Sequence, residues 1–240
     1  DAAKLIDLAT SAQDDATAAA ALKAAAACAA HNTDAAGRSA PFVAALGNAK
    51  GPRRTMIEKS VAKIGGPDAL KIVVADLQSE DKSVRKGALE ALAEWQDFAA
   101  VAPLLEAAKS TDADQQATAL RGLAQLLRAS TGMPAADKSA AYQQALKSAN
   151  RPEDLKMLLG ALATERGQEY FNVATSYLDS DNVKPEASLA VIKIALPKPK
   201  GIPGLKGAKV LEGLKQAIPT CPDGGLKADA QRYLKTLEGK

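Results

Sequence analysis

The sequence has few of the side chains on which most enzyme active sites and metal centres depend. Aromatic residues make up 3% of the 240-residue chain, and His31 is the single histidine. The two cysteines, Cys28 and Cys221, are far apart, so the CxxC type of zinc or redox motif is absent. No glycine-rich stretch has the P-loop or GxGxxG pattern. We therefore predict that the chain is not an enzyme and that it carries no metal or other cofactor.

The sequence also lacks a long apolar run and a strong excess of either charge. No stretch of about 18 consecutive apolar residues exists, so the sequence predicts no membrane insertion. The formal net charge is +3, from 31 basic and 28 acidic residues, whereas nucleic-acid-binding proteins usually carry a larger basic excess. We therefore expect no nucleic-acid partner.

Runs in which Val, Ile or Thr alternate with polar residues, as strands require, are missing as well. Hydrophobic residues nevertheless make up 47% of the chain, and many are alanines, which favour helices. The most apolar segment, ATAAAALKAAAACAA, contains Lys23 and is typical of a packed helix. The sequence therefore predicts an almost wholly helical chain that buries a core.

A two-helix pattern recurs through the middle of the chain. The first helix of each unit has apolar residues three positions apart, such as Leu89 and Leu92, which share one helix face. The units recur at intervals of roughly 30 to 40 residues, as expected when repeats stack and bury a core between neighbours. The predicted first helices are Met56–Ile64, Val84–Trp95, Ala117–Leu127, Leu155–Ala163 and Ala187–Ala195, and the predicted second helices are Ala69–Leu77, Ala99–Ala108, Ser139–Leu146, Tyr170–Leu178 and Lys209–Ile218. We therefore predict a right-handed α-solenoid of about five to six helical hairpins.

Polar turns precede the first helix of most units. They contain Ser, Asp or Asn and so predict side-chain N-caps: SEDKS at Ser79, STDAD at Ser110, ANRPED at Ala149 and DSDNVKPE at Asp179. Pro152 and Pro185 stand where a first helical turn tolerates proline.

The two ends of the chain are less regular than the repeats. Further helices are predicted at Ala2–Ala9, Asp14–Ala30, Ala35–Ala49 and Gly225–Leu237. Pro41 is expected to kink or to start the third of these, and the segment LPKPKGIPGLKGAK from Leu196 is predicted to be a loop. The prediction is one continuous solenoid domain: residues 1–50 form an irregular Ala-rich repeat, 51–196 the regular repeats, and 197–240 a loop and capping helices.

The unit SVRKGALEALAEWQDFAAVAPLLEAAK, from Ser83 to Lys109, resembles a HEAT or HEAT-like repeat. The likeness rests on the Val-Arg pair after an acidic turn, the Ala-Leu ladder and the aspartate that opens the second helix. The order of units from Arg53 to Ala195 is similar to the HEAT-repeat regions of large secreted bacterial proteins. The resemblance implies a non-catalytic spacer or docking surface and an extracytoplasmic location, periplasmic or secreted. The chain opens at Asp1 without Met, so we expect a processed protein or an excised fragment.

Basic residues supply the candidate binding positions. Four of them are predicted to lie at or near first helices, on one shared face that binds a partner: Arg53, Arg85, Arg121 and Lys156. A second group forms the densest basic cluster and is either an anion-binding patch or a solvated loop: Lys198, Lys200, Lys206 and Lys209.

Three other residue types allow two interpretations each. Trp95 is either an exposed contact for a partner or a core residue that closes its helix. His31 is either the base of a His-based catalytic triad or, as we expect, a residue at a helix end, where it can meet the last carbonyl groups. Cys28 and Cys221 either form a disulfide outside the cytoplasm or remain separate thiols.

The leading hypothesis is a non-catalytic scaffold that binds another protein, or another domain of a longer chain, through many dispersed contacts. One rival is a self-assembling structural subunit, with the Ala-rich helix at Asp14–Ala30 as its contact. The other is an enzyme on a HEAT-like scaffold, of the bilin-lyase or DNA-glycosylase type. The small number of aromatic residues and the net charge of +3 give this last hypothesis little support.

Overall fold

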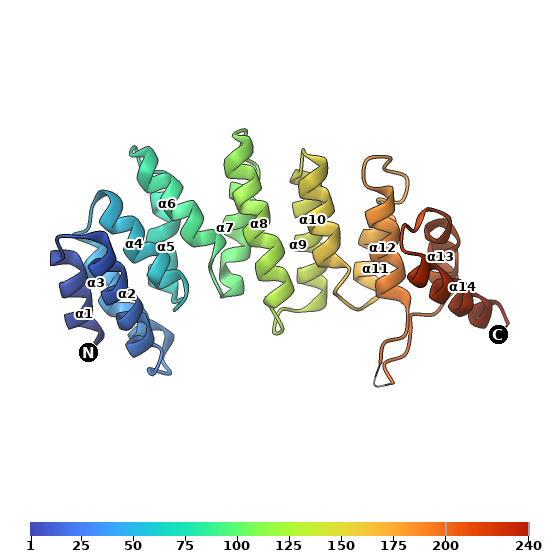
Figure 1. Ribbon diagram of the computed structural model, residues 1–240, viewed down its shortest axis with the longest axis horizontal. Helices are drawn as coiled ribbons and strands as arrows, with labels where there is room; N and C mark the ends of the chain where they lie inside the picture. The colour runs from blue at the N-terminus through green and yellow to red at the C-terminus, as the bar shows by residue number, and fades with distance from the viewer. Residues whose placement is uncertain (200, 240) are drawn as a thin grey trace. The chain divides into compact units, whose positions relative to one another are not determined.

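The computed structural model describes residues 1–199 and 201–239, and its regular elements are helices (Figure 1). The α-helices are α1 (Ala2–Ser11), α2 (Asp15–Ala29), α3 (Ala35–Leu46), α4 (Gly51–Ala62), α5 (Pro67–Asp76), α6 (Lys82–Ala93), α7 (Val101–Ala107), α8 (Ala113–Ala129), α9 (Ala135–Ser148), α10 (Pro152–Leu162), α11 (Gln168–Thr175), α12 (Lys184–Ala195), α13 (Ala208–Thr220) and α14 (Gly224–Glu238), and the short 3-10 helix η1 (Phe98–Ala100) precedes α7. Within the described residues, β-structure is confined to an isolated bridge between Lys198 and Ile202. The prediction of an almost wholly helical chain is confirmed.

Contacts between helices divide the chain into two compact units, Asp1–Ala129 and Ser130–Lys240. In the first unit α4, α6 and α8 pack one against the next, and α5 and α7 pack against them. In the second unit α10 packs against α12, with α9 and α11 beside them and α13 and α14 against α12. Each unit is a stack of helical hairpins, so the predicted solenoid class is confirmed. The division into three segments of one continuous domain stays a prediction.

Every predicted helix is present in the structure, with its ends displaced by a few residues. Pro41 lies inside α3 and not at its start. Trp95 is 3% exposed, which confirms its interpretation as a core residue. It lies just beyond α6, where its backbone N–H donates to the carbonyl of Leu92 at 3.1 Å.

Small residues let the first helices of the first unit approach closely. A Cβ atom added to Gly122 of α8 would lie 2.6 Å from the Cα atom of Ala93, at the end of α6. One added to Gly87 of α6 would overlap the side chain of Thr55 on α4. Because Cβ atoms do not approach other atoms this closely, both positions require glycine for the observed packing.

The first unit buries an ionisable cluster between α4 and α5. The Arg54 guanidinium donates to both carboxylate oxygens of Asp76, at 2.7 and 2.9 Å. Glu58 is fully buried beside this pair, and neither of its oxygens accepts a hydrogen bond from a described residue. Burial, and then the neighbouring Asp76 carboxylate, raise the pKa of Glu58 to about 9, although the Arg54 guanidinium, 3.6 Å from Glu58 Oε1, acts in the opposite direction. Glu58 therefore keeps its proton near pH 7.

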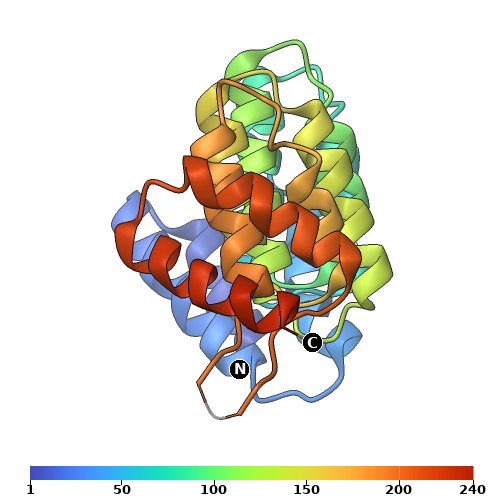
Figure 2. The ribbon, with the colours of Figure 1, turned by 90° about the vertical axis from the view of Figure 1, so that its right-hand side faces the viewer.

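In the second unit, α13 and α14 pack side by side (Figure 2), and α14 confirms the helix predicted at Gly225–Leu237. Between α12 and α13, residues 196–199 and 201–207 form a loop, as predicted. The Arg166 guanidinium holds this loop by donating to the carbonyl groups of Leu196 and Pro203, each at 2.6 Å. The Tyr233 hydroxyl donates to the carbonyl of Leu205 at 2.7 Å, so the loop is anchored at both ends.

A second buried ion pair joins α9 to the turn before α11. The Lys138 ammonium lies 2.8 Å from Glu165 Oε1 and also donates to the Ser130 carbonyl at 3.0 Å. The Tyr142 hydroxyl donates to Glu165 at 3.2 Å. The ring of Tyr142 meets that of Tyr170 edge to face, with centroids 6.3 Å apart. These contacts satisfy a carboxylate that is 12% exposed.

The predicted N-caps are present in some turns and absent from others. Asp81 caps α6 by accepting from the N–H of Ser83 at 2.8 Å, and it also accepts from the Ser83 hydroxyl at 2.8 Å. The hydrogen bond from the hydroxyl, and then that from the N–H, lower the pKa of Asp81. The prediction is wrong for α10 and α12, which follow Arg151 and Val183 without a side-chain cap. Each of these helices has proline in its first turn. Proline has no backbone N–H, so one fewer N–H group at the helix start needs a hydrogen-bond acceptor.

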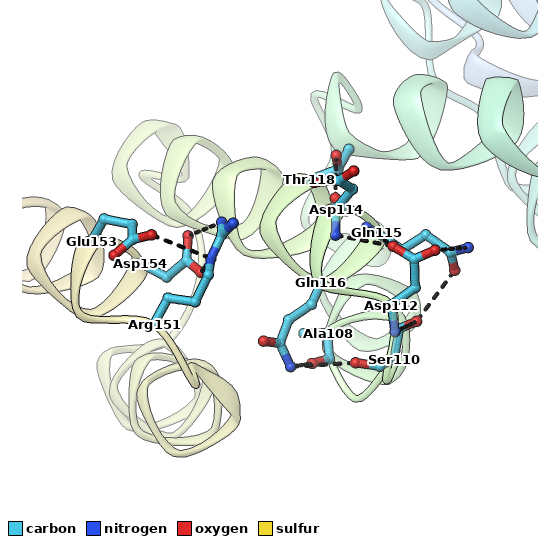
Figure 3. Close-up of polar contacts among 10 residues, drawn as sticks. All are labelled: Ala108, Ser110, Asp112, Asp114, Gln115, Gln116, Thr118, Arg151, Glu153 and Asp154. Atoms are coloured by element: carbon cyan, nitrogen blue, oxygen red, sulfur yellow. Dashed lines mark hydrogen bonds and ion pairs between the residues drawn. The ribbon is translucent and has the colours of Figure 1, made fainter.

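The start of α10 is held by an ion pair in place of a cap (Figure 3). The Nε atom of Arg151 donates to Asp154 Oδ2 at 2.8 Å, within the first turn. Glu153 lies 3.7 Å from the same nitrogen. Acidic residues in a first turn also interact favourably with the positive end of the helix dipole.

Candidate interaction groove

A groove with a volume of about 800 Å³ lies between the α5–α6 hairpin and the α7–α8 hairpin of the first unit. We call it the α5–α8 groove. It is lined by the end of α5, by α6 from Lys82 to Glu90, by α7 from Pro103 onward and by the first turns of α8. Volumes of 300 to 1,000 Å³ are typical of pockets that bind small molecules or short segments of chain.

The floor of the α5–α8 groove is apolar. Leu89 of α6 is 6% exposed and lines the groove, and Val74 and Leu77 line it from the end of α5. Pro103 and Ala107 of α7 complete the floor, and each is partly exposed. Apolar side chains that remain partly open to solvent gain free energy when a ligand covers them.

One wall of the groove is basic and comes from α6. Lys82, Arg85 and Lys86 line it. Arg85 is already engaged, because its guanidinium donates to the carbonyl groups of Ser79 and Glu80 in the preceding turn. The side chain of Lys86 is 80% exposed and lies 3.9 Å from Glu90, while no hydrogen bond or ion pair of Lys82 is found within the described residues. The two lysines therefore present the available positive charge.

The opposite wall is acidic and comes from α7 and α8. Asp112 lies in the turn before α8 and accepts from the backbone N–H groups of Asp114 and Gln115, at 3.0 and 3.1 Å (Figure 3). The side chains of Glu106 and Asp114 are exposed on the same wall. Glu106 forms an exposed ion pair with Lys109. Asp112 thus holds the helix start, and Glu106 and Asp114 present the available negative charge.

Buried polar contacts fix the turn between α7 and α8. The side-chain amide of Gln116 donates to the carbonyl of Ala108 at 3.0 Å and to that of Ser110 at 3.4 Å (Figure 3). Gln116 is 4% exposed, so these bonds form inside the unit. Because the turn is fixed from within, the acidic wall is held in place before any ligand arrives.

A smaller groove, of about 480 Å³, lies among α1, α3 and the start of α4. Arg53 lines it, and its guanidinium donates to the Ala12 carbonyl at 3.2 Å and lies 3.6 Å from Asp15. Arg53 therefore links α4 to the turn between α1 and α2. Its use in this contact leaves the smaller groove with less charge to offer a ligand.

The four predicted partner-binding residues have different surroundings. Arg53 and Arg85 bind backbone carbonyl groups in their own unit, as described above. Lys156 of α10 forms an ion pair with Glu186 of α12 at 3.0 Å. Arg121 is exposed on α8. Among the four, Arg85 lines the α5–α8 groove, and the role of all four in partner binding stays a prediction.

The predicted anion-binding lysines lie on or near the loop that precedes α13. Lys198 lies against the protein, with its ammonium 3.5 Å from the Thr164 carbonyl. Burial, and then the charge of Arg166, lower the pKa of Lys198. Lys206 and Lys209 are exposed, and Lys200 lies outside the described residues. Anion binding by this group stays a prediction.

The remaining sequence candidates are not part of either groove. His31 is exposed beyond the end of α2, with its backbone N–H 3.4 Å from the Cys28 carbonyl. Cys28 is half-buried, Cys221 is buried, and both are free thiols. No group of three or more His, Cys, Asp or Glu side chains that could hold a metal ion was found in the described part of the chain. None of the helices over the same residues is long and apolar enough to span a membrane.

The sequence reasoning missed the charges that this groove presents, namely Lys82, Lys86, Glu106 and Asp114. A signal was available in the two equivalent turns, SEDKS at Ser79 and STDAD at Ser110. The first turn leads into lysines and the second into aspartates, so two neighbouring hairpins begin with opposite charges.

The stacked hairpins and the groove between them define an α-helical repeat protein. No protein-family model matches the chain, and no curated protein matches it. Among solved structures, an engineered protein is similar over 99% of this chain and 68% of its own, with 21% identity and a TM-score of 0.50. A designed armadillo repeat protein in complex with the peptide (KR)4 is aligned over 99% of both chains, with 17% identity and a TM-score of 0.36. The similarity to the engineered protein agrees with the helical-repeat fold.

Proposed function

We propose that this chain is a non-catalytic interaction scaffold that binds a segment of another protein, or of another domain of a longer chain, in the α5–α8 groove. The observation that carries the proposal is the groove itself, with its apolar floor and two walls of opposite charge. Helical repeat proteins commonly use the surface formed by successive repeats to hold partners. The fixed turns on both sides of the groove favour binding, because little conformational entropy is lost there.

The side chains of the groove also favour binding over catalysis. Its hydroxyl groups belong to Ser110 and Thr118. Ser110 is within 3.3 Å of the Gln115 side chain, and Thr118 donates to the Asp114 backbone carbonyl at 2.8 Å. A nucleophilic hydroxyl requires an adjacent general base, and neither the Gln115 amide nor the Asp114 backbone carbonyl is one. The proposal therefore assigns no chemical step to the groove.

The HEAT-like assignment and the extracytoplasmic location belong to the same proposal. Support for the HEAT-like assignment comes from the turn that opens α6. Asp81 caps the helix, and Arg85 donates to two carbonyl groups of the turn. The acidic residue and the Val-Arg pair of the sequence motif thus act together at one helix start. The location rests on the resemblance of the repeats alone.

Affinity capture from an extract of the producing cells tests the proposal. The purified chain is compared with the double variant Lys82→Glu/Lys86→Glu, and retained proteins are identified by mass spectrometry. Lys23→Glu is the matched control, because Lys23 is an exposed lysine in the middle of α2, outside the groove lining. We expect one abundant protein to be retained by the wild type and by the control, and to be reduced with the double variant.

Three results would contradict the proposal. Equal retention by all three proteins would remove the groove as the binding site. If the purified chain captured only further copies of itself, the self-assembling subunit would be favoured. Light scattering at increasing protein concentration would then test that hypothesis. Retention of a nucleic acid or a small molecule in place of a protein would also refute the scaffold hypothesis.

A further inference from the structure

We propose that the segment bound in the α5–α8 groove is a peptide of mixed charge. In this arrangement, apolar side chains cover the floor at Leu89, an acidic side chain lies beside Lys82 and Lys86, and a basic side chain lies on the opposite wall. The inference rests on the proposed function and adds the chemistry of the partner. It follows from which groove charges are already used within the protein and which are free to meet a ligand.

The charges used within the protein are those closest to the helix starts. Arg85 donates to the turn before α6, and Asp112 caps α8. Replacing Arg85 or Asp112 would therefore disturb the start of its own helix, whether or not a ligand is bound. The charges at the rim are different, because the side chains of Lys86 and Glu106 are 80% and 74% exposed. Lys86 pairs with Glu90 and Glu106 with Lys109, but ion pairs of such exposed groups are weak and leave both charges open to a ligand. The rim charges therefore determine which ligand charges are accepted.

Most rim charges are segregated by helix. The exception is Glu90 of α6, which also lines the groove, but its carboxylate lies 2.7 Å from the Lys59 ammonium and 3.9 Å from that of Lys86. Lys82 and Lys86 are one turn apart on α6, so they lie on one face of that helix. Glu106 lies on α7, and Asp114 lies in the first turn of α8. A ligand that fills the groove meets positive charge along one side and negative charge along the other. Electrostatic complementarity of this kind sets specificity more than affinity.

The segregation disfavours a ligand of a single charge sign. A polyanion such as a nucleic acid would be attracted by the two lysines and repelled by Glu106 and Asp114. A wholly basic peptide would be attracted by Glu106 and Asp114 and repelled by the two lysines. The affinity itself comes from covering the apolar floor, where Leu89 and Val74 contribute aliphatic surface. A short segment with apolar residues between acidic and basic ones satisfies all three parts of the groove.

Binding of labelled synthetic peptides, measured by fluorescence anisotropy, tests the inference. The mixed peptide has two glutamates, two leucines and two lysines in that order. Its matched partners replace the lysines with glutamates, or the glutamates with lysines. We expect the mixed peptide to bind the wild-type chain most tightly. The double variant Lys82→Glu/Lys86→Glu should weaken that binding by about tenfold, since two exposed charge pairs are lost.

The same double variant should bind the all-basic peptide more tightly than the wild type does, which a loss of folding could not produce. Lys23→Glu should leave all three affinities unchanged. No detectable binding of the mixed peptide, or equal binding of the all-acidic one, would overturn the inference. Because capture of a natural partner is measured separately, a groove-dependent capture with no mixed-charge preference would reject this inference alone.

Discussion

Replacing Glu58 with glutamine removes a buried proton-binding group while keeping the size and shape of the side chain. In the native protein the carboxyl group of Glu58 is fully buried beside the Arg54–Asp76 pair. A glutamine amide is uncharged, as the protonated acid is. The variant should therefore fold, and it should differ from the wild type mainly in how its stability depends on pH.

The sign of this dependence follows from the direction of the pKa shift. The pKa of Glu58 rises from 4.5 to about 9 on folding, so between these values the folded protein holds a proton that the unfolded chain has released. Stability from this group is complete below pH 4.5 and is lost as the pH rises towards 9. One proton corresponds to about 1.4 kcal/mol for each pH unit. Between pH 6 and pH 8, the wild type should lose about 3 kcal/mol relative to Glu58→Gln.

Urea denaturation followed by tryptophan fluorescence measures this difference directly. Trp95 is the single tryptophan of the chain, and it is buried in the unit that contains Glu58. Glu80→Gln is the control, because Glu80 is an exposed acid on the same unit and should leave the pH slope unchanged. Parallel pH profiles for the wild type and Glu58→Gln would refute the reasoning. So would a wild type that gains stability over the variant as the pH rises.

Three further predictions concern packing and anchoring. Gly122→Ala should destabilise the first unit by about 1 to 3 kcal/mol, because its Cβ would overlap the α6 backbone, and urea denaturation reported by Trp95 measures this loss. Lys138→Met should cost the second unit about 3 kcal/mol by leaving a buried carboxylate without its cation, which hydrogen exchange in α9 and α11 detects. Arg166→Ala should release the loop before α13, so that trypsin cleaves at Lys198 faster than in the wild type.

The helices were predictable because each carries its own local signals. Apolar residues three positions apart place Leu89 and Leu92 on one face, and both are buried. The helix starts were harder to predict, since a polar turn offers several candidate caps and the structure uses one or none. At α10 the N-cap residue is Arg151 and not the asparagine before it, and Arg151 stabilises the first turn through its ion pair with Asp154.

The candidate site was less predictable, because basic residues can be used in two ways. Arg53 and Arg85 were predicted to face a partner, yet both donate to carbonyl groups of their own unit. Long basic side chains near a helix start reach nearby backbone as readily as solvent, and sequence alone does not distinguish the two. The burial of Glu58 was also hard to predict, since its charged neighbours in the sequence, Arg54 and Lys59, are of the kind usual on a solvated helix face. Only the packing of α4 on α5 encloses it.

The close contact at Gly122 has a consequence for how the groove can change. Gly122 meets Ala93 at the C-terminal end of α6, just beyond the groove lining from α6, which runs from Lys82 to Glu90. The glycine thus sets how closely α6 and α8 approach beside the groove. A larger side chain at Gly122 would push the two helices apart and hence alter the width of the groove. A residue outside the groove lining, such as Gly122, can in this way change the width of the groove and hence which ligands fit it.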